Sequence, residues 1–164
     1  MATLTTLADR RDRGQAVIEL ALTLPLLLVI VLGVFDFGLM FQKYEVVTNA
    51  AREGARVGVL PDYTPALARA RALDYMAVGG LTGAPRGSVD SCAGALAPSE
   101  ICVSAVIGTT PITVGGVTKT VNVITVIATY DHEYRFVGPL MTLFGGTLGT
   151  TRISAASMMR MENN

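Results

Sequence analysis

The chain has 164 residues, of which 51% are hydrophobic, and its 13 basic and 13 acidic residues cancel to a formal net charge of zero. This length accommodates one modest domain together with an anchor, and the apolar excess fits a membrane-attached protein better than a fully soluble one. No long Lys/Arg block is present that could follow a phosphate backbone, so the composition argues against a nucleic-acid partner.

A basic leader and a long apolar run dominate the N-terminal region. The leader, residues 1–14, carries three arginines between positions 10 and 13, and the run from Ala16 to Phe35 holds twenty residues with Glu19 as its only charge. Twenty helical residues cover about 30 Å, the thickness of the hydrocarbon core, so the run predicts a transmembrane helix. Because basic residues are denser before the run than after it, we expect the leader to stay in the cytoplasm.

A cleaved secretory signal is a competing interpretation, because a basic segment also precedes the apolar core of such a peptide. The run is longer than a typical signal core, and no A-x-A-like cleavage site occurs between Val34 and Lys43. The sequence therefore favours a helix that is retained.

The carboxylate of Glu19 is costly in an apolar run. On insertion scales an ionised acid near the bilayer centre costs roughly 2.5 to 3.5 kcal/mol, so such a residue usually marks a function or a partner. The alternative is that Glu19, about one helical turn from the leader, reaches the head groups or pairs with Arg13 or Gln15. Both interpretations stay open at this point.

Beyond Asp36, apolar and small residues recur at three- and four-residue steps, which predicts that the helix continues to about residue 60. Four small residues make one face of this second half narrow, so that another backbone could approach closely: Ala51, Gly54, Ala55 and Gly58. A sheet is the expected partner of this face. A helix-dimer seam through Gly54 and Gly58 is the alternative.

The segment from Pro61 to Pro65 ends the long helix, and Thr64 is placed to cap a second helix from Pro65 to about Val78. A loop then extends to about Glu100, in which a short helix over residues 93–96 is conceivable. Strands are predicted where β-branched residues are dense, at residues 101–107, 112–114, 119–134 and 151–161.

The strand over residues 119–134 is rather apolar on both faces, which predicts a central position in the sheet. Gly115 and Gly116 are typical of a hairpin turn leading into it. Between the last two strands, residues 136–149 form an apolar loop or short helix that either covers the core or leans on the membrane surface.

Few side chains in the sequence could support catalysis or bind a metal. Cys92 and Cys102 either close a small disulfide ring, which requires an oxidising compartment, or stay as two free thiols. His132 is the only histidine, and its neighbours on a strand point to the opposite face, so we expect neither a metal site nor a general base there. No nucleophile elbow or phosphate loop is present. These absences argue against an enzyme and against a cofactor.

Gly14, the residues Gln15 to Ile18, Glu19 and the apolar helix that follows are similar to the processing site of type IV pilins and pseudopilins. In that class a prepilin peptidase cuts after the glycine, and the glutamate becomes the fifth residue of the mature chain. Leu20 differs from the aromatic residue that many of these proteins carry after the glutamate. The resemblance extends through LPLLLVIVLGVFDFGLMF and VVTNAAREGARVGVL to the TadE-like family, minor pilin or pseudopilin-like proteins of the tight adherence (Tad) pilus system.

The resemblance covers residues 13–60 and recurs in the last strand, which closes on residues 155–160. It implies an α+β, type IV pilin-like fold, in which a long N-terminal helix, transmembrane and then amphipathic, packs on a small antiparallel sheet of about three or four strands. The domain organisation would be a cytoplasmic leader over residues 1–14, a long helix over residues 15–60, and a periplasmic globular region over residues 61–164.

The resemblance also implies a cleavage site between Gly14 and Gln15 and a pairing role for Glu19. Cleavage leaves a positively charged amine on Gln15, and the carboxylate of Glu19 could pair with the amine of a neighbouring subunit, because either charge alone is costly in a low-dielectric assembly. A glycine can lie extended across a peptidase active site where a larger residue would clash.

The implied partners are a prepilin peptidase, other pilins or pseudopilins and the platform proteins of pilus assembly. The chain would be a single-pass protein of a bacterial inner membrane, either retained there or incorporated in a pilus, with no enzymatic activity and no cofactor. The alternative is a single-pass membrane-anchored periplasmic binding or interaction protein that is not processed, in which Glu19 has no role.

Overall fold

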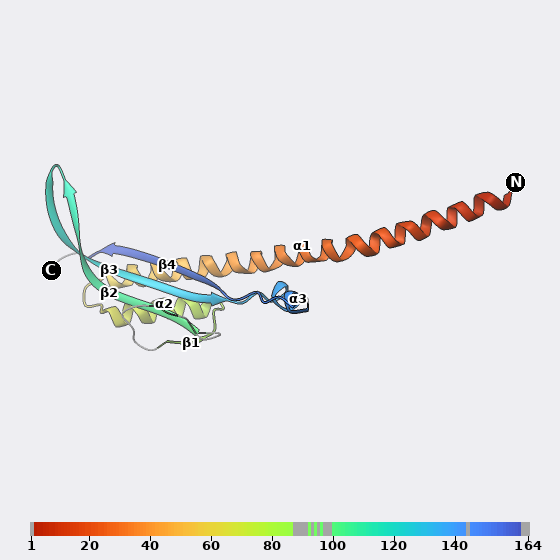
Figure 1. The fold of residues 1–164 in the computed structure, drawn as a ribbon. Helices are drawn as coiled ribbons and strands as arrows, with labels where there is room; N and C mark the ends of the chain where they lie inside the picture. Colours follow the sequence, from red (N-terminus) through yellow and green to blue (C-terminus); the bar gives the residue numbers. More distant parts are fainter. Residues whose placement is uncertain are drawn as a thin grey trace. The chain divides into compact units, whose positions relative to one another are not determined.

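The structure is a computed structural model that describes residues 2–86, 92, 94, 96, 100–143 and 145–161, with side chains from residue 14 onward. Within these residues the chain forms three helices and four strands (Figure 1). In chain order they are α1 (Ala2–Gly58), α2 (Pro65–Val78), β1 (Ala84–Pro85), β2 (Glu100–Val114), β3 (Val117–His132), α3 (Val137–Leu143) and β4 (Thr151–Arg160). The predicted α+β class is therefore confirmed.

The chain divides into two compact units. The first unit comprises residues 1–38 and 134–148, and the second comprises residues 39–133 and 149–164. Helix α1 contributes its first part to one unit and its last twenty residues to the other. The first unit thus holds the apolar run, and the second holds the sheet.

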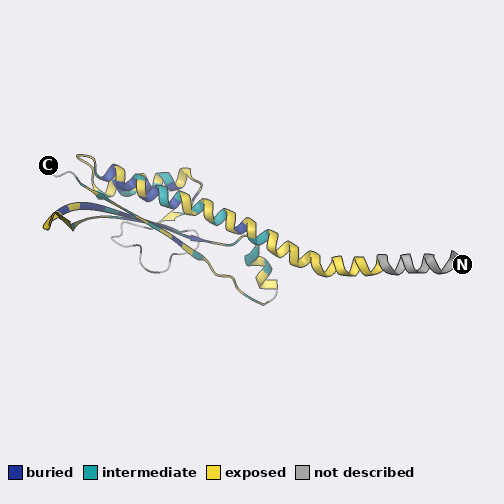
Figure 2. Cartoon of the chain, turned by 90° about the horizontal axis from the view of Figure 1, so that it is seen from above, coloured by how far each residue is buried: buried dark blue, intermediate teal, exposed yellow. Residues whose placement is uncertain are grey.

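Helix α1 is continuous through Pro25. Its apolar run from Ala16 to Phe35 contains no buried residue, and Figure 2 shows most of this stretch as exposed. The run is long and apolar enough to cross a membrane. Exposed leucine, valine and isoleucine side chains over this length would be unfavourable in water, because transfer of apolar surface out of water lowers the free energy.

The sheet of the second unit has the strand order β1-β2-β3-β4 among the described residues. Strands β2, β3 and β4 pair antiparallel, as predicted, and β3 has the predicted interior position. Strand β1 makes the sheet mixed, because its two residues pair with Glu100 and Ile101 of β2 in the parallel direction. The sequence did not predict β1, since it is very short and contains a proline.

Two strands predicted at residues 101–107 and 112–114 are one strand, β2, which runs through Pro111. A proline is tolerated there because β1 pairs only with the start of β2, so the far part of β2 has an edge without a neighbouring described strand. Gly115 and Gly116 have φ angles of 59° and 81°, as a tight type I′-like turn requires. The predicted hairpin is therefore confirmed.

The core of the second unit lies between the end of α1, helix α2 and one face of the sheet. Small residues of both helices pack against branched residues of the strands, and the fully buried members include Val47, Ala50, Ala68, Ala72, Met76, Val103, Ile124 and Val126. Helix α2 begins as predicted, with the backbone N–H of Leu67 donating to the hydroxyl of Thr64 over 3.4 Å. Because the residues between α1 and α2 are small, the backbones of the two helices lie close together.

Candidate functional site: the N-terminal segment and the packing face of helix α1

Gly14 and Gln15, the residues of the predicted cleavage site, lie within helix α1 and are exposed. A Cβ added to Gly14 would have no atom within 4 Å among its surroundings. Packing therefore does not require a glycine at this position. A glycine inside a helix also costs about 1 kcal/mol relative to alanine, so its presence calls for a reason outside the folded chain.

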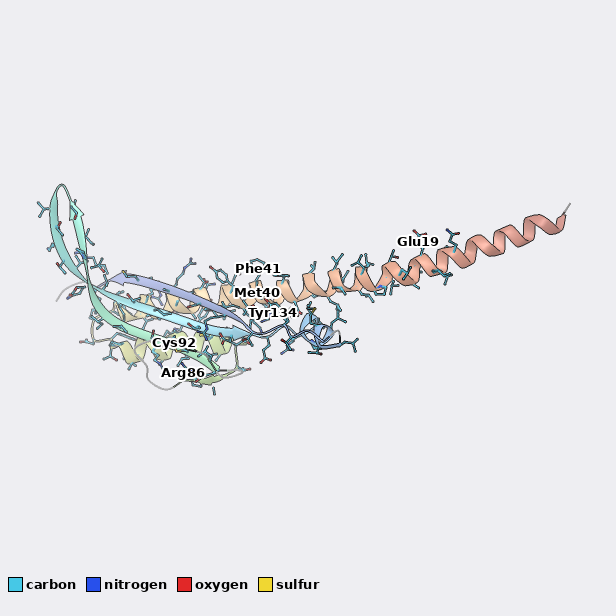
Figure 3. The ribbon with its side chains drawn as sticks, in the orientation of Figure 1. Glu19, Met40, Phe41, Arg86, Cys92 and Tyr134 are labelled. Atoms are coloured by element: carbon cyan, nitrogen blue, oxygen red, sulfur yellow. A yellow bond between two sulfur atoms is a disulfide. The ribbon has the colours of Figure 1, made fainter. Side chains whose placement is uncertain are left out.

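Glu19 projects from α1 as an exposed side chain (Figure 3). Among the side chains described from residue 14 onward, its carboxylate has no hydrogen-bond or ion-pair partner. The hydroxyl of Thr23, one turn later, donates to the backbone carbonyl of Glu19 over 2.9 Å rather than to its carboxylate. The alternative pairing with Arg13 lies outside the described side chains.

The predicted packing face of α1 is buried inside the second unit: Ala51, Gly54, Ala55 and Gly58. A Cβ on Gly54 would lie 2.9 Å from the carbonyl oxygen of Ala68, 3.0 Å from the Cβ of Ala72 and 3.2 Å from Cγ1 of Val126. A Cβ on Gly58 would collide with Cδ1 of Ile124. Helix α2 and strand β3 of the same chain therefore occupy this face, which leaves no room for a second helix at Gly54 and Gly58.

Charged residues on the solvent side of α1 form an ion pair with α2. Glu53 accepts two hydrogen bonds of 2.9 Å from the guanidinium of Arg56. It also forms an ion pair of 3.2 Å with Arg71 on α2. The hydrogen bond from Arg56 is the main reason that the pKa of Glu53 falls to about 2, with Arg71 adding to it against the opposing effect of burial. The carboxylate of Glu53 is thus ionised in any ordinary buffer.

Cys92 and Cys102 form a disulfide, with their Cα atoms 5.7 Å apart, so the interpretation as free thiols is wrong. Cys102 on β2 is fully buried and packs with Leu96. Arg86 and Glu100, which flank the segment that contains Cys92, form an ion pair of 3.1 Å (Cys92 and Arg86 are labelled in Figure 3). The conceivable helix over residues 93–96 falls largely outside the described residues.

The side chains with catalytic potential do not converge. His132 is buried at the end of β3, and the neighbouring Asp131 forms an ion pair of 3.0 Å with Arg152 on β4. No three His, Cys, Asp or Glu side chains gather into a metal-binding group in the part of the chain that the structure describes.

Asp36 was not predicted as a functional residue, yet its carboxylate is buried and accepts several backbone hydrogen bonds. It is 1% exposed, and its carboxylate accepts hydrogen bonds from the backbone N–H groups of Arg135 (3.0 Å), Phe136 (3.0 Å) and Val137 (2.7 Å). These N–H groups lie at the start of α3, where a helix has donors without internal acceptors. The only sequence signal is that Asp36 is the first charge after the apolar run.

These observations define a class of protein. A long N-terminal apolar helix whose second half packs against a four-stranded mixed sheet, with two further helices among the described residues, is an α+β fold like that of a pilin. Residues 14–56 match the family model of TadE-like proteins, so this segment is similar to that family. The match begins at Gly14, includes Glu19 and the apolar run, and ends in the packing face of α1.

The family match confirms the resemblance seen in the sequence and is consistent with a protein associated with the Tad pilus. Comparison with curated proteins and comparison with solved structures each find no match to the chain.

Proposed function

We propose that this protein is a minor pilin or pseudopilin, a structural subunit of a Tad-type pilus or a related secretion apparatus. It is inserted in the bacterial inner membrane through residues 16–35, with residues 1–14 as a cytoplasmic leader and residues 61–164 in the periplasm. A prepilin peptidase cuts between Gly14 and Gln15. The observation that carries the proposal is an exposed acid without a described partner, Glu19, in an exposed apolar helix that matches the TadE-like family.

Processing supplies the partner that Glu19 lacks. The cut creates an amine on Gln15, four residues or about 6 Å of helix before Glu19. In a bundle of such helices, the carboxylate of one subunit pairs with the amine of its neighbour, and neither charge is then left alone in a low-dielectric environment. An unpaired charge in that environment is strongly unfavourable, so the pair fixes the axial register between neighbouring subunits.

Gly14 supports this proposal through what surrounds it. An added Cβ at this position would have no close neighbour, and the glycine weakens the helix in which it lies. The helix unwinds at a low cost in free energy at a glycine, and the missing side chain leaves room in a peptidase active site. Glycine therefore suits a position where the peptide bond must be extended in order to be cut. Gly33, in the same helix and equally free of close neighbours, provides a control for the substitution itself.

The disulfide supports the proposed orientation. Cys92 and Cys102 are paired, and a stable disulfide in a bacterial cell is typical of the periplasmic side of the inner membrane. The basic leader, on the other side of the apolar run, agrees with the positive-inside rule. Both observations favour a cytoplasmic N-terminus and a periplasmic second unit.

The pairing role is tested with Glu19→Ala and Glu19→Gln, beside Thr23→Val as a control one turn along the same helix. The amount of each variant in washed membranes reports insertion, and the amount in sheared pili or in cross-linked complexes reports assembly. Because 1.4 kcal/mol corresponds to a tenfold change and a broken buried pair costs more than that, we expect both Glu19 variants to insert normally and to assemble at least about tenfold less. Normal assembly of Glu19→Ala would remove the proposed role of the acid.

A further inference from the structure

Residues 134–143 and 145–148, which we call the α3 segment, expose several large apolar side chains in the first unit. The segment has one charged residue, Arg135, and its helix α3 contains no buried residue. Its exposed large apolar side chains are Phe136, Met141, Leu143 and Leu148, with Leu143 at 78% exposure. Several large apolar side chains exposed in one short segment favour contact with another molecule or a membrane.

Asp36 ties the start of the α3 segment to helix α1. Its buried carboxylate accepts hydrogen bonds from three successive backbone N–H groups, those of residues 135, 136 and 137. The carboxylate gains the donors that a buried charge needs, and the first turn of α3 gains the acceptor that its free N–H groups need. Because Asp36 directly follows Phe35, the α3 segment begins at the end of the apolar run.

This attachment sets the depth of the α3 segment once the run is in a bilayer. The twenty residues of the run cover the hydrocarbon core of about 30 Å, so Asp36 then lies at its outer boundary. The head-group region adds only about 5 to 8 Å on that side, which is comparable with the width of a helix. Tyr134, labelled in Figure 3, is a residue of a type that is enriched at this level.

We propose that the α3 segment is a membrane-interface anchor, held by Asp36 at the outer surface of the bilayer, with Phe136, Met141 and Leu143 in contact with lipid. Lipid is the occupant that the structure favours, because the segment is hydrogen-bonded to Asp36, directly after an apolar run that has no buried residue and is of membrane-spanning length. The anchor limits how far α1 can slide along the membrane normal. The proposal rests on the membrane insertion that is part of the proposed function.

The chain contains no tryptophan, so a single introduced tryptophan is a unique reporter of depth. The full chain is reconstituted in vesicles of phosphatidylethanolamine and phosphatidylglycerol as Leu143→Trp, with two controls. Leu27→Trp lies in the middle of the apolar run, and Val78→Trp lies in the second unit at a side chain that is 84% exposed. Emission wavelength and quenching by lipids brominated near the head group or deep in the acyl chain are measured for each variant.

We expect a blue-shifted emission for the tryptophan at 143, with stronger loss of intensity from shallow than from deep bromine. The reporter at 27 should be quenched more by deep bromine, and the reporter at 78 should respond to neither. If only the reporter at 27 is quenched, insertion stands and the interface anchor is refuted. If no reporter is quenched, insertion itself fails, and the proposed function fails with it.

A blue-shifted reporter at 143 that brominated lipid does not quench would also refute the anchor, because the side chain would then be covered by protein, such as a second copy of the chain. The role of Asp36 is tested by adding Asp36→Ala to Leu143→Trp. Loss of the carboxylate that accepts from the three backbone N–H groups should reduce quenching of the tryptophan at 143 by shallow bromine, while the reporter at 27 keeps its depth. Unchanged quenching at 143 would refute the role of Asp36 in holding the segment.

Discussion

Gly54→Ala tests the close approach between α1, α2 and β3 most sharply. The added methyl group would meet three neighbours at once, the carbonyl oxygen of Ala68 at 2.9 Å, the Cβ of Ala72 at 3.0 Å and Cγ1 of Val126 at 3.2 Å. The nearest of these atoms belongs to the backbone of α2. Relief therefore requires α2 to move away from α1 rather than a side chain to rotate.

The magnitude follows from two opposing effects. Overpacking of a dense core typically lowers the free energy of unfolding by about 1 to 3 kcal/mol. Replacing glycine by alanine inside a helix raises it by about 1 kcal/mol. The three simultaneous contacts at Gly54 place its overpacking cost in the upper part of that range, about 2 to 3 kcal/mol. We therefore expect Gly54→Ala to lower the free energy of unfolding of the second unit by about 1 to 2 kcal/mol. Gly58→Ala should cost less, because its closest neighbour is Cδ1 of Ile124, the end of a side chain.

Gly38→Ala is the matched control, since it makes the same change in the same helix where the new Cβ has no atom within 4 Å. The assay is thermal unfolding of the full chain in detergent, followed by near-UV circular dichroism of the tyrosines. For a unit of this size, 1 kcal/mol corresponds to about 4 to 8 °C, so the midpoint for Gly54→Ala should fall by at least about 4 °C while that for Gly38→Ala does not fall. A midpoint for Gly54→Ala at or above the wild-type value would refute the packing argument.

Two further predictions concern the second unit. Because Arg56 lowers the pKa of Glu53 from an ordinary 4.5 to about 2, the ion pairs of Glu53 stabilise the fold above pH 4.5 and this contribution is lost as the pH falls towards 2. Glu53→Gln should remove that part of the pH dependence of urea unfolding, about 1 kcal/mol for a solvent-screened surface network, and an unchanged profile would contradict it. Replacing Cys92 and Cys102 together by serine should lower the free energy of unfolding by about 2 to 3 kcal/mol in the same assay, and equal stability would show that the disulfide adds nothing.

Much of the second unit could be predicted because local chemistry determines it. Thr64 before a proline marks the start of α2, and two glycines with positive φ mark the hairpin between β2 and β3. The dense branched residues of β3 indicate an interior strand. In each case the deciding interaction lies within a few residues, so its signal is present in the sequence itself.

The parts that could not be predicted depend on partners far along the chain. The small residues at Gly54 and Gly58 indicate a close approach, but only the structure identifies α2 and β3 together as the neighbours. Strand β1 pairs over two residues, too few to produce a pattern. Asp36 bonds to backbone N–H groups about a hundred positions later, and backbone groups leave no trace in the residue types.

The central claim is that Glu19 obtains its partner through a cut after Gly14, and the intact mass of the membrane-extracted protein tests it most directly. In cells that contain a prepilin peptidase, the wild type should have its N-terminus at Gln15. Gly14→Ala should keep the leader while still inserting, and Gly33→Ala, an equally open position in the same helix, should be cut normally. A wild-type protein that keeps residues 1–14 in such cells would contradict the account.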